Sequence, residues 1–161
     1  MRKPLFLTFA LVVFFAAEFL LFNLFGSWFR PNLLLLLVIF ANSIYGIRYS
    51  LFVAFAAGLL KDSFSAGIFG VHIFAFVLCA YATTLIKRYF YELEIGLSQI
   101  LTTFLISLLN GLTVYCILLI NENINFIQAV QYVILPNVIL TTLVSVFIYK
   151  GLRQCASKLF A

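Results

Sequence analysis

The fold is decided by an apolar run, LFLTFALVVFFAAEFLLFNLF, which extends from Leu5 to Phe25 and is interrupted by Glu18 and Asn23. A membrane-spanning helix needs about 20 such residues, because each residue rises about 1.5 Å and the hydrocarbon core is about 30 Å thick. Five further apolar runs follow, over Leu33–Ile47, Leu51–Leu60, Ile68–Ile86, Leu97–Ile120 and Ala129–Tyr149. The sequence therefore predicts an all-α integral membrane protein.

The composition favours the same class. Of the 161 residues 65% are apolar and 9% are charged, whereas a soluble domain has about 25% charged residues. The length leaves room for one domain, and no loop between the runs is long enough to fold separately. We expect residues 1–161 to form a single polytopic membrane domain, a compact bundle of about six transmembrane helices.

The second and third runs are short for a crossing. Leu33–Ile47 and Leu51–Leu60 are joined by a turn at 46–50, and two interpretations fit them. They are tilted or thin-membrane spans, or they are the two arms of a re-entrant hairpin, which reduces six crossings to four. In both cases the chain leaves on the side it entered, so the later topology is unchanged.

Lys and Arg are distributed unevenly between the two sides. With six crossings and an internal amino terminus, only Arg30 and Lys61 lie outside. The inner residues are Arg2, Lys3, Arg48, Lys87, Arg88, Lys150, Arg153 and Lys158. Because short loops rich in Lys and Arg stay in the cytoplasm, we expect both termini to be cytoplasmic. This bias, with contact to anionic membrane lipid, explains the net charge of +5 without nucleic-acid binding.

Polar residues recur inside the last two runs, where each costs free energy unless it has a partner. They lie at spacings of three and four, which places each set on one helix face. The two stripes are Gln99, Thr103, Ser107, Asn110 and Gly111, and Asn137, Thr141 and Ser145. We expect the stripes to pack against each other. Lining a substrate cavity and contacting a partner's span are the alternatives.

Glu18 lies about two thirds of the way along the first run. A carboxylate at this depth must be protonated, paired or close to water. The favoured partner is an uncharged Asn or Ser of another helix, and the alternatives are a functional polar contact or proton-coupled transport. With an uncharged partner, Glu18→Gln is expected to be tolerated and Glu18→Lys is not.

The reactive residues form no catalytic pattern. The chain has one His, three Cys and five carboxylates, without a nucleophile and base, a carboxylate pair or the spacing of metal ligands. His72 stands alone near the start of the fourth run, where we expect a hydrogen-bonded interfacial residue. The sequence predicts a protein that is not an enzyme and uses no cofactor or metal.

Two motifs carry a family resemblance. FRPN at 29–32 with the Leu run through Leu37, and GLLKDSFSAGIFGV at 58–71, resemble the MreD family of rod-shape-determining membrane proteins. The family has this size and hydropathy profile, an Arg-Pro-Asn or Pro-Asp start to the second span, and a G-x-x-x-D element before a Ser/Gly-rich turn. Lys61 and Ala66 depart from the family pattern. We expect Lys61 to neutralise Asp62.

The motifs also make local physical sense. Pro31 suits the first turn of a helix, where its missing amide costs nothing, and Asn32 can satisfy the free amides there. Asp62 is expected to end the third run. Gly58 follows Ala54 by four residues, a small-residue pair that permits close helix packing.

The resemblance implies a non-catalytic scaffold of the bacterial cell-elongation machinery in the cytoplasmic membrane. It implies action with MreC, a single-span protein with a periplasmic coiled coil. Through that protein it implies indirect links to the MreB filament and to the glycosyltransferase and transpeptidase that build side-wall peptidoglycan. The candidate partner-binding residues are Arg30, Pro31, Asn32, Asp62, Gly67 and Gly70. The alternative interpretation is that these residues merely end helices.

A second hypothesis is a substrate-binding subunit of an energy-coupling-factor vitamin transporter, which has this length and about six spans. Such subunits dock through an Ala-x-x-x-Ala face in the first span. Here Phe14 stands four residues after Ala10, and few polar groups are available to hold a vitamin. The sequence therefore favours the scaffold. A lipid-handling membrane protein is a third possibility.

Overall fold

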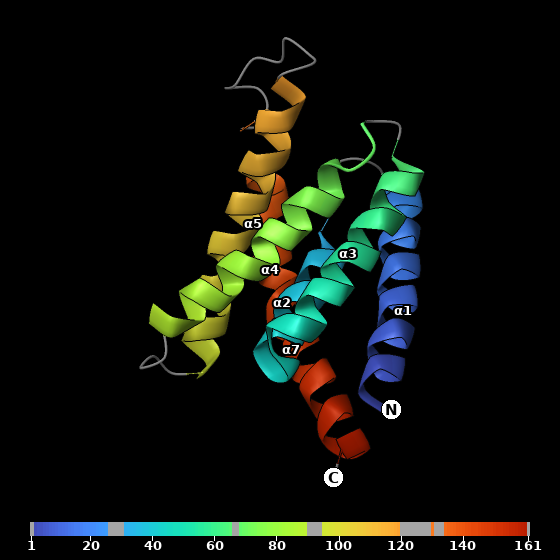
Figure 1. Ribbon diagram of the computed structural model, residues 1–161, viewed down its shortest axis with the longest axis vertical. Coiled ribbons are helices and arrows are strands. Elements are labelled where there is room, and N and C mark those ends of the chain that lie inside the picture. The colour runs from blue at the N-terminus through green and yellow to red at the C-terminus, as the bar shows by residue number, and fades with distance from the viewer. Residues whose placement is uncertain are drawn as a thin grey trace.

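The computed structural model describes residues 2–25, 31–65, 68–89, 95–119, 130 and 134–160. Within these residues the chain forms six helices and no strands, which confirms the all-α prediction. The helices are α1 (Arg2–Phe25), α2 (Leu33–Tyr45), α3 (Ile47–Phe64), α4 (Val71–Tyr89), α5 (Ile95–Leu119) and α7 (Leu135–Phe160). They pack side by side as a bundle with both chain ends at one end (Figure 1).

Four of the described helices are long and apolar enough to cross a membrane. The spans are Pro4–Leu24, Val71–Tyr89, Gly96–Ile117 and Leu135–Leu152. The apolar α2 is shorter, with 13 residues or about 20 Å of helix. These lengths agree with the prediction of a membrane bundle whose second helix is short.

The third helix differs from its expected bounds. It extends from Ile47 to Phe64, 18 residues, rather than from Leu51 to Leu60. Gly46 alone separates it from α2, with a φ of 88° in the left-handed region that glycine adopts without strain. Lys61 and Asp62 lie inside α3 because their charges are bound by groups on other helices, so they do not end it.

The centre of the bundle is α2. Its residues Leu33–Asn42 are all buried, and α2 contacts each of the other five described helices. A helix that is apolar on all sides is stable only when it is enclosed. The Leu run therefore forms the core of the bundle, and the other helices surround it.

The closest helix packing joins α3 and α4. A Cβ on Gly58 would lie 2.5 Å from Ile73 Cα and 2.7 Å from Ile73 N, which are backbone atoms of α4. Ala54 and Ala57 of α3 and Ala75 of α4 are fully buried. The close approach expected at Ala54 and Gly58 is therefore confirmed, and it places the end of α3 against the start of α4.

The two polar stripes lie on helices that pack together, as expected. α5 contacts α7, and Thr103, Ser107, Thr141 and Ser145 are buried. Most of these hydroxyls donate to a carbonyl one turn earlier in their own helix, as Thr103 does to Gln99 O at 2.7 Å. Most hydroxyl groups of the stripes therefore form hydrogen bonds within their own helix. The small side chains of the stripes allow α5 and α7 to approach each other.

Candidate functional site

A polar cluster lies where the end of α3 meets the starts of α2, α4 and α7, in the half of the bundle away from the chain termini (Figure 1). It collects side chains from five of the six described helices or their starts. The members are Glu18 of α1, Asn32 before α2, Lys61 and Asp62 of α3, His72 of α4, and Asn137 and Thr141 of α7. We refer to these seven residues as the polar cluster.

An ion pair joins α1 to α3 within the cluster. Lys61 Nζ lies 2.7 Å from Glu18 Oε1, and the two side chains are 24% and 21% exposed. The second oxygen of Glu18 accepts a hydrogen bond from Leu34 N at 3.2 Å. The ammonium of Lys61 also lies 5.6 Å from the centre of the Phe76 ring, within cation–π range. The expected uncharged partner of Glu18 is therefore wrong, because its partner is a lysine.

Asn32 joins the start of α2 to α3 and α7. Its Oδ1 accepts from Leu35 N at 3.2 Å and from Lys61 Nζ at 3.1 Å. Its backbone N–H donates to Thr141 Oγ1 at 3.0 Å, and that hydroxyl donates to Asn137 Oδ1 at 3.1 Å. Asn32 is thus the N-cap of α2, which confirms its expected capping role. Pro31 precedes the cap, so its expected place in the first turn is wrong.

Asp62 binds the start of α4. Its carboxylate accepts from the backbone amides of Gly70 at 3.0 Å, His72 at 3.1 Å and Ile73 at 3.1 Å. His72 Nδ1 lies 2.8 Å from Asp62 Oδ1. A carboxylate is favoured at this position because the free amides of a helix start carry partial positive charge. The expectation that Lys61 neutralises Asp62 is therefore wrong, because Lys61 pairs with Glu18.

The contact between His72 and Asp62 confirms a hydrogen-bonded role for the lone histidine. An ionised carboxylate only accepts hydrogen bonds, so Nδ1 of His72 carries the proton that the contact requires. Gly70, just before α4, has a φ of 101°, a conformation that favours glycine. Asp62, His72 and Gly70 together fix the turn between α3 and α4.

The structure brings several of the candidate residues together. Pro31 and Gly70 lie beside the polar cluster, whose members include Glu18, Asn32, Asp62 and Asn137. Arg30 and Gly67 lie outside the described residues. Gln99 and Asn110 lie on α5, and none of their described hydrogen bonds involves the cluster.

Sequence reasoning missed three cluster members, Lys61 as the partner of Glu18, His72 as the partner of Asp62, and Thr141 as the acceptor for Asn32. One signal was present. Glu18 interrupts an apolar run and Lys61 closes another, and two opposite charges in such positions favour pairing.

We expect Glu18 and Lys61 to be energetically coupled. Glu18→Gln keeps an acceptor for Leu34 N but leaves the Lys61 ammonium without its counter-charge, so the earlier expectation of tolerance no longer holds. In a double-mutant cycle with Glu18→Gln and Lys61→Met, the coupling free energy should be about 1–3 kcal/mol, measured by unfolding in mixed detergent micelles. Strictly additive losses would show that the pair contributes nothing.

A family model described as rod shape-determining protein MreD matches residues 3–155. Neither a curated protein nor a solved structure matches the chain. The matched range includes both sequence motifs and the whole polar cluster, and it favours the rod-shape interpretation over vitamin transport. Members of the family are generally non-catalytic, multi-pass membrane proteins with a role in cell shape. The chain belongs to the MreD family of rod shape-determining proteins.

Proposed function

We propose that the chain is a non-catalytic membrane scaffold of the cell-elongation machinery, acting with an MreC-like single-span coiled-coil protein to regulate side-wall peptidoglycan synthesis. Its links to an MreB-like filament and to the elongation glycosyltransferase and transpeptidase are indirect. The scaffold is one domain over residues 1–161 in the bacterial inner membrane. Family membership supports the role in cell shape.

The scaffold mechanism is supported mainly by one observation. The two carboxylates of the polar cluster bind other groups of the same chain. Glu18 binds Lys61 and an amide of α2, and Asp62 binds three amides and the ring of His72. These contacts fix the ends of α1, α2, α3 and α4 relative to one another. A surface held in this way can bind a partner without first paying the entropy of ordering itself.

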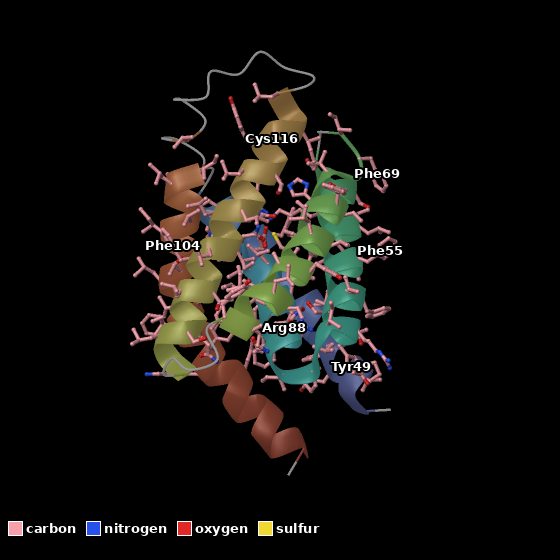
Figure 2. The ribbon with its side chains drawn as sticks, turned by 60° about the vertical axis from the view of Figure 1, so that its left-hand side comes forward. Tyr49, Phe55, Phe69, Arg88, Phe104 and Cys116 are labelled. Carbon is pink, nitrogen blue, oxygen red and sulfur yellow. The ribbon has the colours of Figure 1, made fainter. Side chains whose placement is uncertain are left out.

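The partner contact in this proposal is the exposed surface beside the polar cluster. Phe64 and Phe69 are 68% and 65% exposed, and Ile68 is 42% exposed. Figure 2 shows Phe69 at the outer edge of the bundle, at the end away from the termini. Asn32 and Asp62 are buried, so they act by positioning this surface. Pro31 is buried as well, Gly70 is half-buried, and Arg30 and Gly67, which lie outside the described residues, are the remaining candidates for the contact.

The charge distribution supports cytoplasmic termini. Arg88 and Tyr49 lie towards the end of the bundle that carries the termini, whereas Cys116 and Phe69 lie towards the other end (Figure 2). Lys61 is at that other end too, where its charge is bound by Glu18. A basic end of this kind is retained in the cytoplasm.

A surface substitution tests the proposed contact. Phe69→Ser should strongly reduce co-purification of the MreC-like protein from cross-linked membranes and should produce rounded cells, because it removes an exposed aromatic anchor. The matched control is Phe104→Ser on α5, which is 41% exposed on a different side of the bundle (Figure 2) and should change neither result.

Two failures are distinguishable. If Phe69→Ser retains the partner and the rod shape at normal protein levels, the contact lies elsewhere on the bundle. If cells that lack the whole chain keep both their shape and their rate of side-wall synthesis, the scaffold function itself is wrong.

A further inference from the structure

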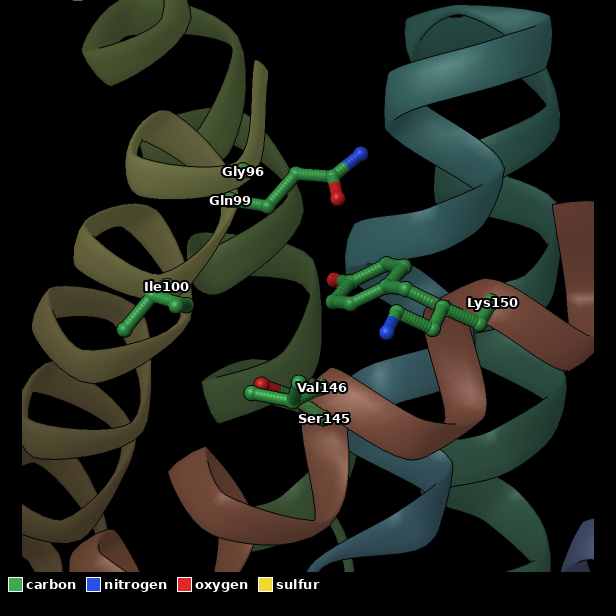
Figure 3. A pocket seen from close by; sticks show the side chains of 7 residues that line it. Gly96, Gln99, Ile100, Ser145, Val146 and Lys150 are labelled. Carbon is green, nitrogen blue, oxygen red and sulfur yellow. The ribbon is translucent and has the colours of Figure 1, made fainter. Parts of the chain in front are cut away.

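A cavity of about 130 Å³ lies between α5 and α7, and none of its lining residues belongs to the polar cluster (Figure 3). Its lining residues come from the first turns of α5 and from the middle of α7. They are Gly96, Gln99, Ile100, Ser145, Val146, Tyr149 and Lys150. The role proposed above uses none of these residues.

The cavity is mostly apolar, and its rim lies on the outside of the bundle. Ile100 and Val146 are 39% and 37% exposed on the outer faces of their helices. A Cβ on Gly96 would meet no atom within 4 Å, so the wall is open at this residue. A dry apolar cavity of about 150 Å³ can hold a benzene molecule, so this volume suits a segment of hydrocarbon chain.

Polar groups lie at the same cavity. The Tyr149 side chain is only 6% exposed, and its hydroxyl has no hydrogen-bond partner among the described residues. The Thr103 hydroxyl, which donates to Gln99 O at 2.7 Å, lies near the phenol but outside hydrogen-bond geometry with it. The Tyr149 ring packs 6.2 Å from Phe40 of the central helix, centre to centre, which fixes its position. A buried hydroxyl without a partner is unusual, and a ligand that parts α5 and α7 slightly would reach it and supply the missing hydrogen bond.

The charge at the rim is positive. Lys150 is exposed near the end of the apolar span Leu135–Leu152, at the depth where a helix meets lipid headgroups. Figure 3 shows the Gln99 amide and the Lys150 ammonium extending into the space between α5 and α7. The carboxylates of Glu18 and Asp62 are bound within the polar cluster and do not line the cavity.

We propose that this cavity is a binding site for an anionic phospholipid. An acyl chain lies along the apolar wall at Ile100 and Val146, and the headgroup phosphate pairs with Lys150. The Tyr149 hydroxyl and the Gln99 amide donate to the ester and phosphate oxygens. The site would hold one lipid between α5 and α7, in addition to the lipids that surround the bundle.

The test is native mass spectrometry of the full chain purified in detergent and titrated with lipids of identical acyl chains. Phosphatidylglycerol should bind with several-fold higher occupancy than phosphatidylcholine. Lys150→Gln should lower phosphatidylglycerol binding to the phosphatidylcholine level, whereas Arg48→Gln, on α3, should not. Inorganic phosphate in excess should not displace the bound lipid, because it lacks the acyl chain.

Two further variants separate the cavity from the charge. Gly96→Leu places a side chain in the open wall and should reduce the binding of both lipids, whereas Gly151→Leu, also in open space but outside the lining, should bind as wild type. Tyr149→Phe removes only the hydroxyl and should lower phosphatidylglycerol occupancy at unchanged helix content. Wild-type binding by Lys150→Gln, Gly96→Leu and Tyr149→Phe would overturn the proposal.

Discussion

Gly58→Ala is expected to produce a loss of stability of about 3 kcal/mol or more, at the upper end of the range for an overpacked core. The added Cβ would lie 2.5 Å from Ile73 Cα and 2.7 Å from Ile73 N. These are backbone atoms, so no rotamer change can relieve the contact. α3 and α4 must move apart, and the movement also pulls the Asp62 carboxylate away from the amides that it binds.

The measurement is the unfolding midpoint of the purified chain as the denaturing detergent fraction is raised. Gly151→Ala is the matched control, because it makes the same substitution in α7 where a Cβ meets nothing within 4 Å. That variant should be unchanged or slightly more stable, since alanine favours a helix more than glycine does. Equal midpoints for the two variants would show that α3 and α4 are not in backbone contact at Gly58.

The second large effect is expected for Asp62→Ala. The substitution leaves the amides of Gly70, His72 and Ile73 without their acceptor at the edge of the membrane. Each buried donor without a partner costs about 1–3 kcal/mol, so the total loss should be about 3 kcal/mol or more. The stability of Asp62→Asn should lie between those of Asp62→Ala and the wild type. The asparagine retains one acceptor oxygen, but it turns an N–H₂ group towards the amide donors.

Hydrogen exchange measures this effect at individual backbone amides. In Asp62→Ala, the amides of Gly70, His72 and Ile73 should lose protection while the amides of the buried α2 keep theirs. Ser63→Ala is the control, since Ser63 is exposed and its hydroxyl donates only to Leu59 O within its own helix. If the protection of the three amides is unchanged in Asp62→Ala, another group holds the start of α4.

The sequence predicts the helices of this protein better than the contacts between them. Long apolar runs identify α1 and α5 nearly to the residue, because a spanning helix needs little more than length and hydropathy. The bounds of α3 were wrong because Lys61 and Asp62 suggest a helix end when their partners are unknown. Charges that are bound by other helices are compatible with a further turn of helix, and α3 continues to Phe64.

The contacts of the candidate site could be predicted only in part. Asn32 caps the helix that directly follows it, and local capping rules apply at that distance. The partner of Glu18 is 43 residues away along the chain, and the partner of the Asn32 amide is 109 residues away. Hydropathy and spacing within a run carry no information about which helices become neighbours, so these contacts required the structure.

The enclosure of α2 has a consequence for how the protein is made. Because the chain is synthesised from its amino terminus, α2 enters the membrane long before α7, which it contacts in the finished bundle. Until Thr141 arrives, the Asn32 amide lacks its hydroxyl acceptor and one side of the Leu run faces lipid. A chain interrupted before α7 is therefore a target for membrane proteases and chaperones, rather than a smaller working protein.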